Sequence, residues 1–265
     1  MLICLCSAKG APGVTTSGLA LALAWPGDVV LADLDPAGGD VLAGYGRGEI
    51  SAGLEEILVA ARRDGLTRQL DAHLLTLDAS GKARLLPGLA DPGAARHLDW
   101  NRVASSLATV GESVGAALAD CGRLRTKYFP AEVVDQADVV VVVTRSSLRD
   151  VHAAARGIEE LRTNLGPRAL LLALVVGPGE PYGEREISEA LRVPVVASLP
   201  WDAKPAGVLS DGRPAGRSFA QTSLMRAAGV AASRLAEASW RHASATVAQP
   251  APGVVPAASG GGHVD

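Results

Sequence analysis

Apolar residues along the chain gather in short continuous runs, and segments with helical spacing separate these runs. We expect strands at residues 2–6, 29–33, 74–77, 116–120, 139–144, 170–176 and 195–199. These runs do not alternate with polar residues, which is typical of strands buried on both faces of a sheet. Helices are expected at about residues 16–24, 51–63, 94–110, 147–164, 184–191 and 218–242. This order predicts an α/β fold with a single, doubly wound, mostly parallel sheet and helices on both faces.

Length and composition predict one large domain and a short tail. The chain has 265 residues, of which 48% are hydrophobic and 20% are charged. This is enough for one sizeable α/β core, which we assign to residues 1–242, and it argues against a second full domain. Residues 243–265 are rich in Pro, Gly and Ala and low in charge, so we expect them to form a disordered tail.

Net charge and cysteine content limit the binding partners and the cellular compartment that the sequence predicts. The formal net charge is −3, so no global field favours nucleic acid or an anionic membrane. Three cysteines without a C-x-x-C spacing form neither a disulfide framework nor a zinc motif, which indicates a reducing cytoplasm. Cys4 and Cys6 fall in the first expected strand and suit core packing. We expect no signal peptide, because the N-terminus lacks a basic region and a cleavage site. We also expect no membrane-spanning helix, because no apolar stretch approaches about 18 residues.

A glycine-rich loop joins the first expected strand to the first expected helix. Residues 7–18 read Ser-Ala-Lys-Gly-Ala-Pro-Gly-Val-Thr-Thr-Ser-Gly. Such a turn lets main-chain N–H groups and the positive end of the helix surround phosphates, and Gly10, Gly13, Thr15 and Thr16 suit that task. The usual pattern is G-x-x-x-x-G-K-[ST], but Val14 stands in the place of its lysine. A simple Gly/Pro turn is the structural alternative.

The loop resembles the deviant Walker A motif of the ParA/MinD family, K-G-G-x-G-K-T-T. Lys9 directly precedes the first glycine, as the signature lysine does in that family. The resemblance implies that ATP and Mg²⁺ bind here, and that Lys9 has a catalytic role in which it reaches across a dimer to the partner's nucleotide. The loop residues expected to contact the nucleotide are Lys9, Gly10, Ala11, Gly13, Val14, Thr15 and Thr16.

An acidic segment follows the second expected strand, where the chain reads D-L-D-P at residues 33–36. Carboxylates beside a triphosphate repel it unless a metal ion or a water lies between them, as in a Mg²⁺-dependent hydrolase. A turn favoured by Asp-Pro is the alternative. The segment is similar to the D-x-D-P box of the ParA/MinD family. This similarity implies that Asp35 is catalytic and orients the attacking water, and that Asp33 supports the metal.

A third acidic position follows the fourth apolar run, which ends at Asp120. The family carries its Walker B carboxylate at this point, so the resemblance implies that Asp120 holds Mg²⁺ through water, together with Thr15. Asp138 opens the valine-rich strand, and we expect it to be mainly structural.

Two later positions bear on recognition of the base. The strand at 170–176 is followed by Gly177, where the family often has an asparagine that reads adenine, so base recognition from this position is in doubt. Pro200 and Trp201 are similar to the family's loop beside the base. Trp201 either packs there or fills an edge of the core.

The resemblance covers residues 1 to about 240, and details such as the segments at 120–123 and 199–202 are similar to the branch that positions pilus or secretion machinery. It implies an ATP-dependent dimerising switch that positions a cargo, such as this machinery or a division or DNA-partition complex.

Val14 argues for weak hydrolysis, because the loss of one preorganised cation commonly costs about a hundredfold to a thousandfold in rate. The alternative is a catalytically inactive pseudo-ATPase scaffold that acts through protein–protein interaction. A metallochaperone or an amidotransferase-like synthetase is less favoured, because the histidines are scattered and no nucleophile motif is legible.

Partner predictions follow from the same resemblance. We expect a homodimer with nucleotide between the protomers, and an unidentified protein cargo or activator. The last expected helix carries four arginines and dispersed apolar residues, which favours packing on the sheet over direct membrane anchoring and leaves recruitment to a membrane by a partner possible. Arg62, Arg63 and Arg68 form either a basic patch or a solvated helix face, so non-specific DNA binding is open but unsupported.

Overall fold

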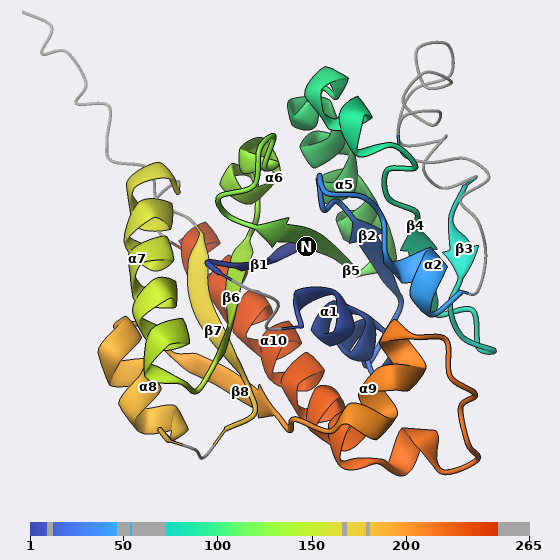
Figure 1. Ribbon diagram of the computed structural model, residues 1–265. Helices are drawn as coiled ribbons and strands as arrows, with labels where there is room; N and C mark the ends of the chain where they lie inside the picture. The colour runs from blue at the N-terminus through green and yellow to red at the C-terminus, as the bar shows by residue number, and fades with distance from the viewer. Residues whose placement is uncertain (10–12, 47–53, 55–72, 166–168, 179–180, 249–265) are drawn as a thin grey trace, which may run out of the picture.

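The computed structural model describes residues 1–9, 13–46, 54, 73–165, 169–178 and 181–248. Within them, eight strands form one sheet in the order β3-β4-β2-β5-β1-β6-β7-β8 (Figure 1). All paired strands are parallel except β3 and β4. The strands are β1 (Leu2–Ser7), β2 (Val29–Asp33), β3 (Leu75–Thr76), β4 (Ala83–Leu86), β5 (Ala116–Arg123), β6 (Val139–Arg145), β7 (Leu170–Val176) and β8 (Val195–Leu199). The expectation of a single, mostly parallel sheet is confirmed.

Helices cover both faces of the sheet (Figure 1). One face carries α5 (Trp100–Val114), α6 (Ala131–Asp135), α7 (Leu148–Asn164) and α8 (Glu184–Leu191). The other face carries α1 (Val14–Leu23), α9 (Ala203–Ser210), α10 (Ser223–Ala248) and the short α2 (Val41–Gly44). Two 3₁₀ helices, Pro92–His97 and Phe219–Gln221, precede α5 and α10. Two layers of helices on a parallel sheet explain why its central strands are apolar on both sides.

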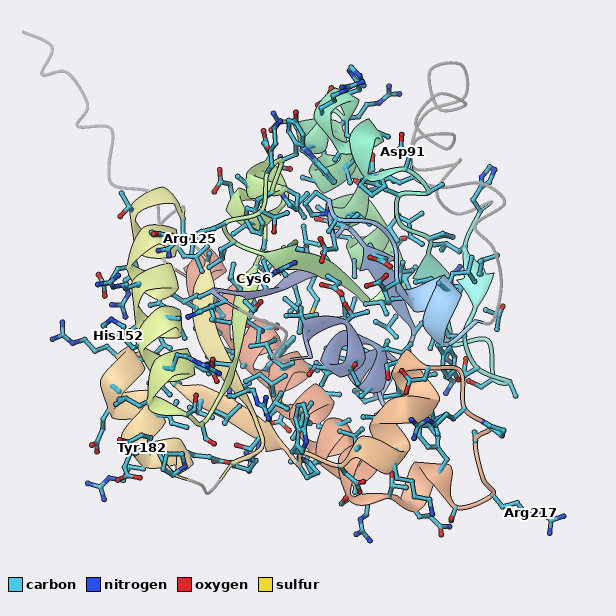
Figure 2. The ribbon with its side chains drawn as sticks, in the orientation of Figure 1. Cys6, Asp91, Arg125, His152, Tyr182 and Arg217 are labelled. Carbon is cyan, nitrogen blue, oxygen red and sulfur yellow. The ribbon has the colours of Figure 1, made fainter. Side chains whose placement is uncertain are left out.

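Alternate residues of the central strands fill two separate apolar cores. In β1, Leu2, Cys4 and Cys6 pack against the layer of α5 to α8, whereas Ile3 and Leu5 pack against the layer of α1 and α10. All three cysteines are buried and free, which confirms the core packing expected of Cys4 and Cys6, and Figure 2 shows Cys6 in the middle of the sheet.

β5 has one residue more than β1 near the carboxyl ends of the two strands. Leu5 pairs with Asp120, but Ser7 pairs with Arg123, so the register shifts by one between these pairs. Directly paired residues share a face of the sheet, and Arg123 therefore lies on the side of Ser7, which is the side of α1. Simple alternation along β5 would instead have placed Arg123 on the side of α5. A bulge of this kind re-aims a side chain at the end of a strand.

The edge of the sheet beyond β2 differs from the sequence prediction. The strand expected at 74–77 is only two residues long, is exposed, and runs antiparallel to β4. β4 was not predicted, although it lies parallel to β2 and has a mostly buried face. A four-residue run that includes Arg84 gives little periodic signal, and only its neighbours in the sheet make it a strand.

Several helices also differ from the prediction. The helix expected at 94–110 is divided into a 3₁₀ helix and α5, because the Asp99 side chain accepts a hydrogen bond of 3.2 Å from the Arg102 N–H and starts a new helix. The short helices α2, α6 and α9 were not predicted. The helix expected at 51–63, apart from Leu54, lies outside the described residues, and so do Arg62, Arg63 and Arg68.

The last helix, α10, packs on the sheet as expected. Its buried residues contact α1 and β8, and they include Leu224, Ala228, Ala231 and Leu235. The helix continues to Ala248, six residues beyond its expected end, and residues 249–265 of the expected tail lie outside the described residues. Among the helices that the structure describes, none has the length and apolar composition needed to cross a membrane.

Asp138 has the structural role expected of it. Its carboxylate accepts a hydrogen bond of 2.8 Å from the Leu2 N–H, and its main-chain N–H donates to the Leu2 carbonyl at 2.9 Å. These bonds fix the start of β1 against β6, and hence the position of the loop that follows β1.

Candidate functional site

The carboxyl ends of β1, β2 and β5 border one cavity of about 820 Å³. β1 lies at the point where the chain connections turn to opposite sides of the sheet, which is where open α/β sheets bind ligands. The wall of the cavity includes residues 13–16, Asp35, Asp40, Gly122 and Arg123. The structure therefore brings four of the expected loop residues to the same cavity as the expected catalytic carboxylate.

The start of α1 presents main-chain donors to this cavity. Gly13 adopts the left-handed conformation, with φ of 91°, and its carbonyl accepts the Ser17 N–H at 2.8 Å. No side chain caps the first turn of α1, so its amide groups are available to a ligand with negative charge. Lys9 is exposed and is not part of the cavity wall. Gly10 and Ala11 lie outside the described residues.

Val14 turns the expected position of a lysine into part of the core. Its side chain is only 7% exposed and packs in the apolar core that also contains Leu5 and Val41. One edge of it still borders the cavity. The wall at this point is therefore aliphatic and supplies no positive charge.

Asp35 stands at the cavity wall in close contact with Gly122. Its Oδ1 accepts a hydrogen bond of 2.8 Å from the Ala37 N–H. Gly122 has a φ of 66°, and a Cβ at this position would lie 2.4 Å from the carboxyl carbon of Asp35. Only glycine gives both this backbone conformation and this approach. The segment after Asp120 and the segment after β2 are thus fitted to each other.

Asp120 lies fully buried beside the start of α1. Its Oδ1 accepts a hydrogen bond of 3.0 Å from the Gly122 N–H, while its Oδ2 has no hydrogen-bond partner among the described residues. Burial raises the pKa of Asp120 above its usual range, and the charges of Asp35 and Asp40 act in the same direction. The Thr15 side chain opposes this shift by favouring the ionised form.

Asp33 is also buried, but it is held away from the cavity wall. It pairs with Asp120 across β2 and β5, and its Oδ2 accepts a hydrogen bond of 3.1 Å from the Val41 N–H. Burial raises the pKa of Asp33, and the neighbouring charge of Asp120 raises it further. A role of Asp33 at a metal ion stays a prediction.

The residues around this cavity fit a divalent cation together with a phosphate group. The charges of Asp35 and Asp40 help to raise the pKa values of the buried Asp33 and Asp120, so a nearby cation would favour the ionised forms of this pair. The buried Asp120 Oδ2 and the buried Ser7 Oγ lack partners among the described residues, and Ser7 borders the cavity. Oxygen atoms of carboxylates and hydroxyls are the ligands that Mg²⁺ prefers. The described residues offer no cluster of three or more His, Cys, Asp or Glu side chains that would hold a metal by itself, so a bound phosphate would have to complete the coordination.

A second, smaller pocket adjoins the cavity. It has a volume of about 370 Å³ and shares Gly13, Thr16, Ser210 and Asp211 with the cavity. Its walls are largely apolar and include Val176, Leu199, Pro200, Trp201 and Leu224. A polar cavity joined to an apolar pocket matches the two ends of a nucleotide.

Trp201 borders this pocket and does not fill the core. It is 59% exposed, and the Arg145 guanidinium lies 3.9 Å from the centre of its ring. Gly177 has a φ of 69°, and a Cβ there would lie 3.2 Å from the Trp201 Cβ. The alternative that Trp201 fills an edge of the core is therefore wrong, whereas contact of Pro200 and Trp201 with a base stays a prediction.

The residues of the cavity wall that sequence reasoning missed include Ser7, Asp40, Arg123 and Asp211. Asp40 and Arg123 each lie a few residues beyond a motif that was recognised, so a search of the following turn could have found them. Asp211 follows α9, a helix that the apolar pattern did not reveal.

Comparison with known proteins identifies the fold. No protein-family model and no curated protein matches the sequence. The chain is similar to MinD in the MinC:MinD cell division complex of Aquifex aeolicus, with a TM-score of 0.72, 18% identity and coverage of 88% of this chain and 95% of that one. The septum site-determining protein MinD of Pyrococcus horikoshii OT3, complexed with Mg-ADP, has a TM-score of 0.71 and 16% identity, with 91% and 98% covered. A ParA family ATPase of Chlorobium tepidum TLS has a TM-score of 0.69 and 18% identity, with 87% and 98% covered. The fold is that of ParA/MinD-like P-loop ATPases.

Proposed function

We propose that this chain is an ATP-binding switch of the ParA/MinD type that dimerises around Mg·ATP, hydrolyses it slowly and positions a cellular cargo. The observation that supports this most is the convergence of an uncapped helix start, Asp35 and Thr15 on one cavity that adjoins an apolar pocket. The shared fold supports it further, because the MinD of Pyrococcus horikoshii was crystallised with Mg-ADP.

Each part of the site has a role in this proposal. The main-chain amides of residues 13–16 bind the phosphates, as amides at a helix start do for anions. Thr15, and Asp120 through water, hold Mg²⁺, which shields the phosphate charge. Asp35 accepts a hydrogen bond from the water that attacks the terminal phosphate and orients it. Pro200 and Trp201 flank the base.

Val14 accounts for the slow hydrolysis in this proposal. Negative charge moves within the transferred phosphate group during the reaction, and a preorganised cation beside it is usually the largest catalytic contribution. Binding is less affected, because amide groups and Mg²⁺ do not depend on residue 14. We expect Lys9 to reach the nucleotide of a second protomer, which is consistent with its exposure and with its absence from the cavity wall.

A catalytically inactive scaffold is the second candidate, and the burial of Val14 favours it. In that case the chain keeps the fold and a dimer surface but turns over no ATP. In both cases we place the protein in the cytoplasm, with membrane recruitment left to a partner. The cargo is a pilus, secretion, division or partition complex.

Titration calorimetry with Mg·ATP and a phosphate-release assay test the proposal together. We expect binding below millimolar concentration, with slow phosphate release that Asp35→Ala abolishes. Asp28→Ala is the matched control, because Asp28 is exposed at the opposite end of β2. The absence of binding at millimolar Mg·ATP would rule out the switch. Binding without any phosphate release would favour the scaffold, and release that Asp35→Ala leaves unchanged would contradict the assignment of Asp35.

A further inference from the structure

The balance of charge at the cavity shows what the site lacks. Among the described residues that form its wall, three carry a carboxylate, namely Asp35, Asp40 and Asp211, of which Asp211 is paired with Arg213 at 3.2 Å. Asp33 and Asp120 lie buried behind them. One divalent cation cannot neutralise Asp35, Asp40 and Asp120 together with a nucleotide triphosphate, which itself carries several negative charges. A phosphate ligand therefore needs a further cation from the protein.

Arg123 is the only cationic side chain among the described residues of the cavity wall. It closes β5 beside Ser7, the residue that leads into the glycine-rich loop, and the Leu124 N–H donates to the Ser7 carbonyl at 2.9 Å. The extra residue in β5 turns Arg123 to the face on which α1 begins. The same bulge holds Gly122 against Asp35, so the position of Arg123 and the position of Asp35 are set by one feature.

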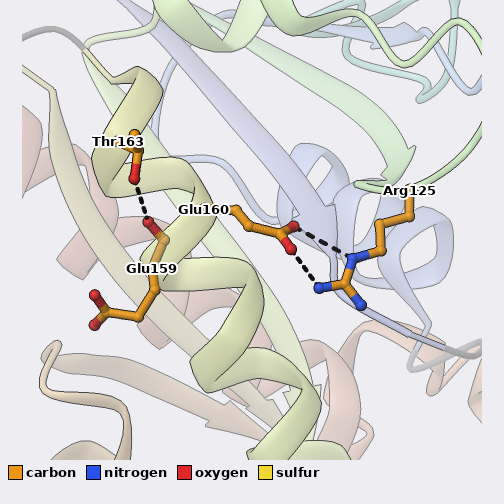
Figure 3. A network of polar contacts seen from close by, with 4 residues as sticks. All are labelled: Arg125, Glu159, Glu160 and Thr163. Atoms are coloured by element: carbon orange, nitrogen blue, oxygen red, sulfur yellow. Dashed lines mark hydrogen bonds and ion pairs between the residues drawn. The ribbon is translucent and has the colours of Figure 1, made fainter.

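Arg123 has no acidic partner in the part of the chain that the structure describes. Its neighbour Arg125 differs in this respect, because its guanidinium forms an ion pair with Glu160 of α7 (Figure 3). Figure 2 shows Arg125 beside α7, away from α1. Two arginines that lie two residues apart therefore have different surroundings: one is neutralised, and the other is free to bind a ligand at the cavity.

We propose that Arg123 binds the phosphates of the nucleotide and supplies the positive charge that Val14 does not. This inference rests on the proposed function, since it concerns the same site. An arginine suits the task because its planar guanidinium can donate two parallel hydrogen bonds to a phosphate. In this proposal the cation beside the phosphates comes from the end of β5 and not from the first turn of α1. Because Arg123 is exposed to solvent in the free protein, its charge needs no buried acidic partner before the nucleotide binds.

Equilibrium binding of Mg·ATP to the full chain tests this inference, measured by calorimetry with wild type, Arg123→Gln, Arg123→Lys and Arg125→Gln. A charge-assisted bond to phosphate contributes enough that we expect Arg123→Gln to weaken binding by about 10- to 100-fold. Arg123→Lys should lose less, because it keeps the charge but not the planar fork. Arg125→Gln is the matched control and should stay within about twofold of wild type, since its charge is paired with Glu160.

The possible results distinguish a failure of this inference from a failure of the proposed function. If Arg123→Gln binds Mg·ATP as tightly as wild type, the inference is wrong while the proposed function stands. If Arg125→Gln loses as much as Arg123→Gln, the effect is one of general charge and the specific role of Arg123 is again refuted. If wild type itself fails to bind, the proposed function fails and this inference fails with it. A thermal melt of each variant shows whether it is folded, which we expect because both arginines are exposed.

Discussion

The two walls of the cavity differ in how they are built. The wall at the ends of β2 and β5 is acidic and tightly constrained, with Asp120 fully buried and Asp35 pressed against Gly122. The wall at the start of α1 carries no charge at residue 14, because Val14 packs into the core. In the acidic wall, the backbone of Gly122 lies against the side chain of Asp35, so a change at one of these residues affects the other. The helix start offers main-chain amides, so one side chain can change there without removing these hydrogen-bond donors.

Restoring a cation to the helix start should have the largest effect. We expect Val14→Lys to raise the rate of phosphate release by about 100-fold, because a preorganised cation would again stand beside the transferred group. The lysine stem can follow the apolar wall while its charge reaches the cavity that Val14 borders. Single-turnover phosphate release measures the rate, with Val14→Met as the control. Equal rates in the two variants would show that the missing charge does not limit hydrolysis.

Disturbing the acidic wall through its glycine should come next. Gly122→Ala places a Cβ on the Asp35 carboxyl and also imposes a left-handed conformation, which costs about 1–2 kcal/mol by itself. We expect loss of phosphate release together with a lower free energy of unfolding in urea. Gly81→Ala is the matched control, since Gly81 has a φ of 72° but a Cβ there would meet no atom within 4 Å. If both variants lose the same stability and keep hydrolysis, the contact with Asp35 is unimportant.

A smaller effect concerns the pH dependence of stability. Burial, with the charge of Asp120, raises the pKa of Asp33 from 3.8 to about 8. Between about pH 4 and 8, the folded state therefore keeps a proton on Asp33 that the unfolded state has already lost. The free energy of unfolding consequently falls as the pH rises through that range. Asp33→Asn should leave the melting temperature unchanged near pH 4 and raise it at pH 8 by about 2–4 °C, which corresponds to about 1 kcal/mol.

Thermal melts in EDTA at pH 4 and pH 8 measure this change. Asp28→Asn provides the control, because Asp28 is exposed. If Asp33→Asn is no more stable than wild type at pH 8, the pKa of Asp33 is not raised by its surroundings in the folded state.

The smallest effect is expected at the apolar pocket, where ATP and GTP should bind within about threefold of each other, a difference below about 0.7 kcal/mol. Gly177 offers no side chain to the base, and Arg213 of the pocket wall is paired with Asp211 at 3.2 Å. Competition of the two nucleotides against a fluorescent analogue measures the ratio. A preference above tenfold would reveal a base-reading group that these side chains do not provide.

The sequence was most informative where chemistry and strand pattern coincide. Continuous apolar runs such as the valines of β6 predicted the central strands, since burial on both faces leaves little freedom in composition. Gly13, Thr15 and Asp35 were predicted to lie at one site because parallel strands bring their carboxyl ends to one edge of the sheet.

The parts that the sequence did not predict depend on tertiary contacts. β4 becomes a strand through pairing with β2, and α9 is a helix of eight residues whose Asp202 cap gives a weak local signal. Arg123 is the clearest case, because ordinary alternation along β5 assigns it to the wrong face. A shift of register at one pair is a property of two strands, and no pattern within either strand records it.

The bulge in β5 separates two tasks that a regular strand would combine. Before the bulge, the residues of β5 alternate between the two apolar cores. After the bulge, the alternation continues with the opposite phase. Deleting Cys121 or Gly122 would leave Arg123 opposite Ser7 by regular alternation, but the strand would then lack either a buried core thiol or the glycine that accommodates Asp35. The extra residue therefore lets the end of one strand serve the core, the Asp35 contact and the cavity together.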